Sequence, residues 1–302
     1  MGKYITLTKV AMGYEPPEFV SQRIFPELGV PGSPLEIKKF GKEMFKQYMS
    51  RRAMFAASNI VRMGKVDYLY VRIEPRDQVR QFDKEHEPTN EKPDKNQMTK
   101  EAKQGVLLDV EIDNSERMFT AANYPTGHKI VLSGTDQFSD LDNSQPIQVI
   151  DEGMQAVSRK IGKKPNLMLL PEDVFHVIKW HSQLKMKSLT GDETAATLDH
   201  LKDRFSIERI EIASSLKLNE TTNEFDWIWS KHILLMYVNP NPNPNVKEMS
   251  FGYRLREKGY PFVDDDIEGI DKTKIEAVRY NDKFEDTILC AEAAYFIQDA
   301  IA

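Results

Sequence analysis

The chain has 302 residues, of which 40% are hydrophobic and 29% charged, an ordinary balance for a folded protein with a large core. Its formal net charge of −6 argues against a protein whose main task is to grip nucleic-acid phosphates, since that affinity comes from clustered Lys and Arg. Cys290 is the single cysteine, so an intrachain disulfide is excluded. No apolar run approaches about 18 residues and no signal segment is visible, so we expect about two domains, no membrane contact and a cytoplasmic location.

Residues 1–34 contain five prolines and show no sustained helical or strand period. Phe19, Val20, Ile24 and Phe25 are apolar, so the segment should lie along a surface. Two interpretations stay open at this point. The segment is either a strap on its own body or an arm that reaches a neighbouring subunit.

The next segment, Leu35–Ile73, is locally basic and ends in an alternating pattern. Between Val66 and Ile73, apolar and polar residues alternate in a way that suits a strand with two differently used faces. We therefore predict a long β-hairpin with its tip around Ser50–Asn59; the alternative is a solvated charged face. The basic residues are Lys38, Lys39, Lys42, Lys46, Arg51, Arg52, Arg62 and Lys65.

A polar segment and a long helix are expected next. Arg76–Asn96 contains two prolines and many charges, which predicts a loop. Gln97–Asn123 has an imperfect apolar stripe that predicts a helix capped by Asn96 or Thr99. Such a helix would be on the order of 40 Å long, and a break near Asp109–Asn114 is left open.

The most regular stretch is Leu132–Pro171. Five apolar residues fall at helical spacing after Pro146, with Ser144 as the expected N-cap and Gly162 as the expected C-terminal stop. Asn166–Leu170 predicts a buried strand, and a further helix starts at Pro171. The first helix should bury Ile147, Ile150, Met154, Val157 and Ile161, and the second Val174, Val177, Ile178 and Leu184.

Further elements follow with weaker patterns. A short helix should begin at Thr190, and Leu216–Asp226 should be a polar turn between two strands. Trp227 and Trp229 should point the same way along the second strand, and the proline-rich Asn239–Asn245 should be an exposed loop. The remaining expected strands are Ile207–Ala213, Trp227–Tyr237, Ser250–Arg256, Ile275–Val278 and Phe284–Cys290.

No pattern selects a catalytic, cofactor-binding or metal-binding residue. His176 and His181 are five residues apart, whereas zinc pairs on one helix usually use a spacing of four. Asp264–Asp265–Asp266 lacks the spaced ligands of a Ca²⁺ loop and predicts a solvated acidic turn. Cys290 lies in an apolar strand and predicts inert packing.

A family resemblance rests on several short motifs. Phe138–Ser139–Asp140, Pro146–Ile147 and Pro165–Asn166 resemble, in this order, motifs of the major capsid proteins of tailed bacteriophages, which share the HK97-like fold. Further matches are Val174–Phe175, His181, the N-arm phrase Ile24–Leu28, Leu235–Val238 and the Ser-Phe-Gly segment at Ser250. Ser230 departs from the family, which has glycine after the tryptophan of an Ile-Trp-Gly strand.

The resemblance implies an α+β capsid fold with five parts. These are an N-terminal arm (1–34), an extended loop (35–80), a peripheral domain with a spine helix (81–144), an axial domain (145–245) and a return to the peripheral domain (246–302). At the carboxyl end it implies a strand that runs into a small Ala-rich helix within Ala291–Ala302.

The implied function is that of a major capsid protein, not an enzyme. Copies would form hexameric and pentameric capsomers of an icosahedral shell around double-stranded DNA, which they touch loosely and without sequence preference. A separate scaffold protein and a portal would take part, and the virion capsid would assemble in the host cytoplasm. Two alternatives stay open: an encapsulin-type cargo shell and an enzyme with an unrecognised site.

Overall fold

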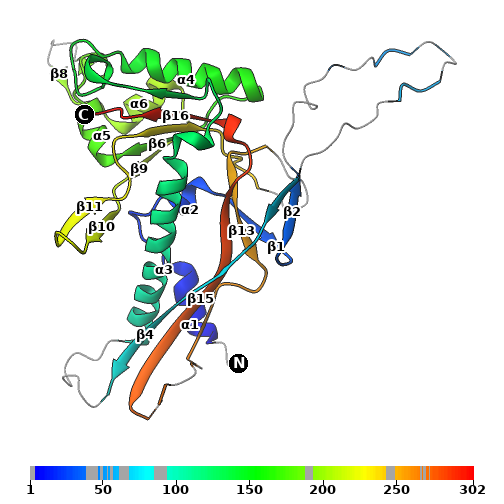
Figure 1. Cartoon of the computed structure of the whole chain (residues 1–302), viewed down its shortest axis with the longest axis vertical. Helices are drawn as coiled ribbons and strands as arrows, with labels where there is room; N and C mark the ends of the chain where they lie inside the picture. Colours follow the sequence, from blue (N-terminus) through cyan, green and yellow to red (C-terminus); the bar gives the residue numbers. More distant parts are fainter. Residues whose placement is uncertain are drawn as a thin grey trace.

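The computed structural model describes an elongated α+β protein built on two sheets (Figure 1). The α+β class predicted from the sequence is confirmed. The described residues are 4–38, 47, 50–52, 54, 57–60, 68–84, 94–187, 193–242, 249–265, 267, 270–271 and 273–302.

The upper sheet in Figure 1 holds most of the hydrophobic core. Its five strands lie in the order β5-β16-β12-β6-β9, with β6 parallel to β9 and β12 antiparallel to both of its neighbours. Every residue of β6 and β12 is buried, which is typical of strands covered on both faces. The strands are β5 (Lys129–Val131), β6 (Leu167–Pro171), β9 (Arg209–Ala213), β12 (Ile233–Met236) and β16 (Ala294–Gln298).

Helix α4 (Pro146–Ile161) covers this sheet and confirms the predicted helix. Its first residue is proline, whose missing N–H is not needed there, and Gly162 ends the helix with a φ of 69°, a left-handed conformation that favours glycine. Gly153 allows close packing, because a Cβ there would lie 2.7 Å from Cδ1 of Tyr295 on β16. The predicted N-cap is wrong: the side chain of Ser144 does not cap the helix.

Ser144 is instead part of a buried contact with His181, which follows α5 (Glu172–Ile178). The Ser144 hydroxyl donates to the Asp140 carbonyl oxygen at 2.6 Å, so it accepts from His181 Nε2 at 2.9 Å. His181 Nδ1 accepts the Gln183 backbone N–H at 3.2 Å, which fits a neutral imidazole. Burial lowers the pKa of His181, although Asp140 and Asp142 oppose the shift.

The elements after α5 differ from the prediction in several places. Helix α5 ends at Ile178, so the buried Leu184 lies beyond it. The next helix is α6 (Leu198–Phe205), capped by the Thr197 side chain; it does not include Ala195, and Thr190 lies outside the described residues. The short strands β7 (Met186–Lys187) and β8 (Glu193–Thr194) pair between the two helices.

The predicted polar turn at 216–226 is wrong, because this segment is a β-hairpin. Strands β10 (Leu216–Asn219) and β11 (Glu224–Trp227) pair in antiparallel register. The predicted strand Trp227–Tyr237 is therefore interrupted at Ile228–His232. Trp227 is 40% exposed and Trp229 is fully buried, so the prediction that the two rings point the same way is also wrong.

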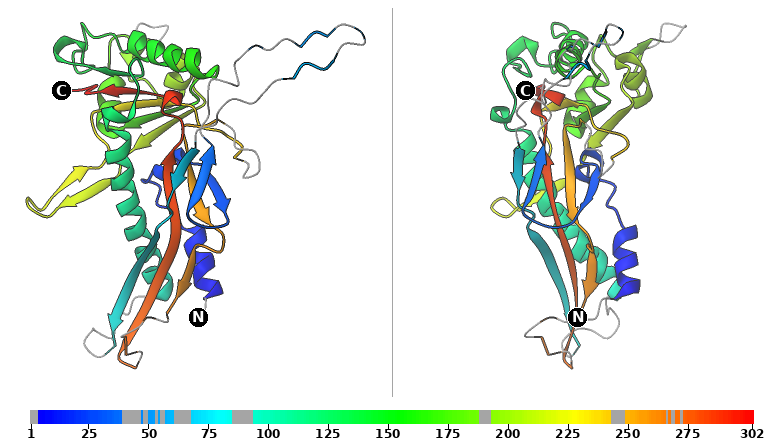
Figure 2. Two further views of the ribbon diagram at one scale, coloured as in Figure 1. Left: turned by 45° about the vertical axis from the view of Figure 1, so that its right-hand side comes forward. Right: turned by 90° about the vertical axis from the view of Figure 1, so that its right-hand side faces the viewer.

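The lower sheet is built around β15 (Ile275–Ile288), a strand of 14 residues that joins two separately predicted strands. One half of β15 pairs with β13 and the other half pairs with β4 and β14 (Figure 2). The predicted loop at 76–96 is wrong over its first part, which belongs to β4. The other strands are β1 (Glu27–Val30), β4 (Pro75–Asp83), β13 (Gly252–Glu257) and β14 (Phe262–Asp264).

Helix α3 (Lys95–Met118) runs beside β4 and β15 as one continuous rod of 24 residues, about 36 Å long. The long helix is confirmed, and no break occurs near Asp109–Asn114. The predicted caps are wrong, because Asp94 occupies the N-cap position and no side chain caps the helix. The predicted helix extends to Asn123, but Ala121–Asn123 forms a separate 3-10 turn in which Ala122 is exposed.

The N-terminal segment folds onto the body of its own chain. Sequence reasoning missed its two helices, α1 (Ile5–Gly13) and α2 (Ser21–Ile24), although the expected apolar residues around α2 are buried. Lys103 of α3 donates to the carbonyl oxygens of Ala11, at 2.8 Å, and Tyr14, and burial lowers its pKa. This buried ammonium ties the end of α1 to the long helix.

The carboxyl end and the proline-rich loop also differ from expectation. The small helix after β15 is a 3-10 turn, Ala291–Ala293, and the chain then enters β16 rather than ending in a helix. Asn239 is buried rather than exposed, and its backbone N–H donates to Ser250 Oγ. Residues 243–248 lie outside the described part.

Within the described residues, no helix is both long and apolar enough to span a bilayer.

Substitutions on α4 test the position of its buried face. Ile150→Asp should abolish cooperative folding, because Ile150 is buried and an aspartate there would lack a partner. Met154→Asp should lower the free energy of unfolding by less, since Met154 is half-buried. Ile150→Val should lower it by about 1 kcal/mol. Urea unfolding followed by circular dichroism measures all three. A wild-type unfolding midpoint for Ile150→Asp would show that the face is misplaced.

The buried imidazole of His181 should make stability depend on pH. Its pKa is lowered in the folded state, so the unfolded chain binds the proton more tightly. The neutral imidazole therefore contributes to the free energy of unfolding above about pH 6.5. This contribution is lost as the pH falls through that value toward the folded-state pKa. The free energy of unfolding is measured in urea at pH 7.5 and 5.5, about one unit either side of that value. It should change less between these two pH values in His181→Gln than in wild type. His176→Gln, an exposed imidazole on the preceding helix, is the control. Equal pH dependence in His181→Gln and wild type would contradict this role.

Candidate assembly surfaces

The base of the segment 35–73 is a two-stranded ribbon anchored on the body. Strands β2 (Leu35–Lys38) and β3 (Tyr68–Val71) pair in antiparallel register. Val71 and Ile73 are buried against the lower sheet, whereas Tyr68 and Tyr70 are exposed, Tyr70 by 71%. The alternation predicted from the sequence is confirmed over the described residues; Val66 and Asp67 lie outside them.

Parts of the predicted tip, around Ser50–Asn59, belong to the described residues. Arg52 Nη1 donates to Ser58 Oγ at 3.2 Å, and the Asn59 side-chain amide donates to the Arg51 carbonyl oxygen at 3.1 Å. These two hydrogen bonds join Arg51 and Arg52 to Ser58 and Asn59. In Figure 1 these residues lie well away from the two sheets.

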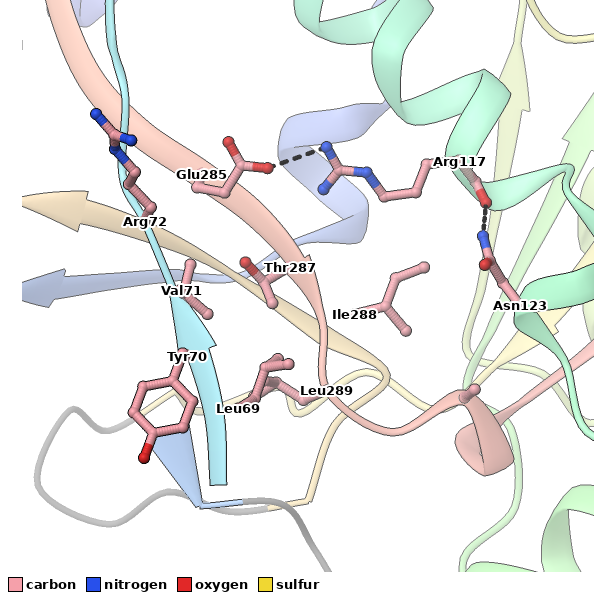
Figure 3. A pocket seen from close by; sticks show the side chains of 11 residues that line it. Leu69, Tyr70, Val71, Arg72, Arg117, Asn123, Glu285, Thr287, Ile288 and Leu289 are labelled. Atoms are coloured by element: carbon pink, nitrogen blue, oxygen red, sulfur yellow. Dashed lines mark hydrogen bonds and ion pairs between the residues drawn. The ribbon is translucent and has the colours of Figure 1, made fainter. Parts of the chain in front are cut away.

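A groove of about 590 Å³ opens beside β3 (Figure 3). One wall is β3 with Tyr70 and Arg72, and the other is the upper end of β15 with the end of α3. Within this second wall, Arg117 Nη2 of α3 contacts Glu285 Oε1 of β15 at 3.0 Å. Thr287 Oγ1 is buried on its floor and has no hydrogen-bond partner among the described residues.

The groove is open because β4 pairs with β15 only as far as Lys283. Beyond that point β15 pairs with β13 on one side, from Phe284 to Ile288. Burial raises the pKa of Glu285, and the nearby Arg117 partly opposes that shift. Sequence reasoning missed this groove because it joins three elements that are far apart in the chain.

A buried ion pair joins two strands of the lower sheet, and a hydrogen bond from the long helix extends it. Arg254 on β13 donates to both carboxylate oxygens of Asp286 on β15, at 2.7 and 2.6 Å. Asn114 of α3 donates to the same carboxylate at 2.7 Å. Although burial of Arg254 disfavours its charge, Asp286 outweighs it, so the pKa of Arg254 is raised. The arrangement fixes the distance between helix and sheet.

A second buried carboxylate connects the N-terminal segment to the long helix. Glu111 of α3 accepts the backbone N–H groups of Val20 and Ser21, at 2.8 and 3.0 Å, and the indole N–H of Trp229 at 2.7 Å. Three segments that are far apart in sequence therefore meet at one side chain. No local pattern in the sequence distinguishes Glu111 from the exposed acids of the same helix.

The residues considered for chemistry lie apart from one another. His181 is buried against Ser144, whereas His176 is exposed, with Nε2 3.1 Å from Glu172. Cys290 is a buried free thiol that lies after β15 and not within it, and burial raises its pKa. Within the described residues, no three His, Cys, Asp or Glu side chains are placed to hold a metal ion.

The acidic run at Asp264 corrects a further prediction. A solvated turn was expected, but Asp264 is fully buried at the end of β14. Its two carboxylate oxygens accept hydrogen bonds from Arg279, both at 3.0 Å. Asp265 accepts from the Tyr4 hydroxyl, and Asp266 lies outside the described residues. The run therefore contributes to the sheet and to the N-terminal segment.

The arrangement of the chain, two sheets beside a long helix with the ribbon β2–β3 packed on the lower sheet, matches phage capsid structures. No family model matches the chain. The major capsid protein of Burkholderia phage BcepMu is 31% identical over 294 residues, which cover 96% of this chain and 94% of that protein. Among solved structures, a phage-related protein from Bordetella bronchiseptica RB50 has a TM-score of 0.76 at 23% identity, over 99% of this chain and 97% of that one. The putative capsid protein of an E. coli CFT073 prophage has a TM-score of 0.55 at 12% identity, over 98% and 99%.

These similarities define a capsid shell protein with the HK97-like fold. The chain belongs to the major capsid proteins of tailed bacteriophages, since its similarity to one of them extends over almost its whole length. Its role is structural and its location is the virion capsid.

The buried ion pair should dominate the stability of the lower sheet. Asp286→Asn would leave the Arg254 charge buried without its partner, at a cost of about 3–5 kcal/mol. Asp199→Asn, which removes an exposed partner of Lys202, should change stability little. Unfolding of the unassembled chain in urea measures both variants. Equal, small losses of unfolding free energy in Asp286→Asn and Asp199→Asn would show that the buried ion pair does not stabilise the lower sheet.

Proposed function

We propose that copies of this chain form hexameric and pentameric capsomers that tile an icosahedral shell around double-stranded DNA. The observation that carries the proposal is the ribbon β2–β3: its inner face is anchored on the body, and Tyr68 and Tyr70 on its outer face are exposed among the residues that the structure describes. Apolar side chains on a projecting ribbon are stabilised when another surface covers them. The full-length similarity to a phage major capsid protein supports identical copies as that cover.

The five parts expected from the sequence carry over as a proposal. The upper sheet with α4, within 145–245, would form the axial domain at the capsomer centre. The lower sheet with α3 would form the peripheral domain, with contributions from 81–144 and 246–302. The segment 35–80 would overlap the next subunit, and 1–34 would contribute contacts at its outer side. Complementary charges would fix the register between neighbours more than they add affinity.

The proposed partners follow from the same role. Contact with DNA would be loose and without sequence preference, in keeping with a net charge of −6. A scaffold protein and a portal would direct assembly in the host cytoplasm. The scaffold would be a separate protein, because no scaffold domain is recognised in this sequence. The chain would carry out no catalysis. The encapsulin-type cargo shell is the alternative, and the similarity to a phage capsid protein argues against it.

Electron microscopy of the expressed protein, with and without its genomic neighbours, tests the proposal most directly. Closed shells of uniform size are the expected result, and nucleic acid inside native particles would separate a virion from a cargo shell. A chain that stays monomeric at high concentration, even with its genomic neighbours present, would contradict the proposal.

Removing most of the loop should separate folding from assembly. Deletion of Lys42–Val66 spares β2, β3 and every buried residue of the two sheets, so the unfolding midpoint should stay close to that of wild type. Shells should be absent, because the overlap between neighbours is lost. Circular dichroism and electron microscopy measure the two properties. Normal shells from this variant would refute the role of the loop.

A further inference from the structure

The hairpin β10–β11 presents an apolar face that the described part of its own chain leaves exposed. Leu216 pairs with Trp227 and Leu218 pairs with Phe225, so the four side chains lie on one face of the ribbon. All four are exposed, Phe225 by 71%. Cross-strand apolar pairs of this kind stabilise a sheet face when that face is covered.

The hairpin projects from the upper sheet on one side of the molecule, and the ribbon β2–β3 stands on the other side (Figures 1 and 2). Tyr68 and Tyr70 form the exposed face of β3, next to the exposed Arg72. Two different open faces on opposite sides of one molecule are what a head-to-tail contact requires. Such a contact closes into a ring when the rotation between subunits allows it.

The charges of the two segments are complementary. Residues 216–227 contain three acidic side chains and one lysine, whereas residues 35–73 contain nine basic and three acidic side chains. The alternation of the hairpin pairs Lys217 with Asp226 on its second face, which is opposite to the apolar one. The net negative charge of the hairpin segment and the net positive charge of residues 35–73 would favour contact between these two segments of different copies.

We propose that the apolar face of β10–β11 on one copy docks against the outward face of β3 on a second copy. The proposal rests on the proposed function, since it names the surface that receives the base of the loop. The occupant is a second copy of this chain, and the contact is head-to-tail. Aromatic rings on both sides, Phe225 and Trp227 against Tyr68 and Tyr70, would form its centre.

Crosslinking within assembled particles tests this contact. In a Cys290→Ala background, the double variant Tyr70→Cys/Phe225→Cys, treated with a flexible bismaleimide, should give a ladder of covalent oligomers on a denaturing gel. Each single-cysteine variant should give monomer only, because a head-to-tail contact joins two different positions. Tyr70→Cys/Trp180→Cys, which pairs β3 with another exposed aromatic, should give no ladder. Dimers from Phe225→Cys alone, or crosslinks only to a different protein, would overturn the proposal.

Substitutions on the hairpin test the same contact without crosslinking. Phe225→Asp should lower the yield of shells at least about tenfold, because a charge would be buried in the contact. The melting temperature of the unassembled chain should not change, since Phe225 is exposed there. Lys217→Gln, on the opposite face of the same hairpin, should assemble like wild type.

The outcomes separate this inference from the proposed function. If Phe225→Asp assembles normally and the deletion of Lys42–Val66 does not, the loop is required but the hairpin is not its receiving surface, and the inference is overturned. If both variants assemble normally, the proposed function of the loop fails as well. Loss of shells in Phe225→Asp together with the ladder from the double-cysteine variant supports both.

Discussion

The ion pair between Arg254 and Asp286 is the constraint on which the rest of the structure depends. It lies inside the lower sheet, between β13 and β15, and Asn114 extends it to the long helix. The ring of Phe284 lies beside three guanidinium groups, with Arg254 at 4.4 Å from its centroid. A buried charge pair with its hydrogen bonds satisfied fixes the register of β13 on β15, since sliding one strand past the other would leave a charge unpaired, and Asn114 holds the long helix to the same carboxylate. The body is therefore a rigid wedge, which suits a subunit that must meet its neighbours at set angles.

The contrast between this body and its two projections explains the function. The two sheets bury their apolar residues, and the buried carboxylate of Glu111 ties the N-terminal segment to the same frame. The ribbon β2–β3 and the hairpin β10–β11, in contrast, expose aromatic side chains on opposite sides of the molecule. A capsid protein needs both properties. Under the proposed function, the frame would set the curvature of the shell, and identical copies would cover the open faces.

The sequence predicted the elements whose signal is local. Helix α4 was predicted from its apolar spacing, Pro146 and Gly162, and the existence of two different faces on β3 was predicted from alternation. The strand β4 was missed because its residues are polar and its pairing with β15 is nearly 200 residues away in the chain. The hairpin at 216–227 was missed because its apolar face is open to solvent and so resembles a turn. The roles of Glu111, Asp264 and Ser144 depend on partners from distant segments, which no local pattern shows.

Hydrogen–deuterium exchange, compared between the unassembled chain and assembled shells, tests the central claim most directly. Amides of β15 should be protected in both states, because the frame is complete within one chain. Amides of Tyr68–Val71 and of the hairpin at 216–227 should gain strong protection only in shells, because copies cover them there. Equal exchange of both projections in the two states, or loss of protection in β15 when shells form, would contradict the account.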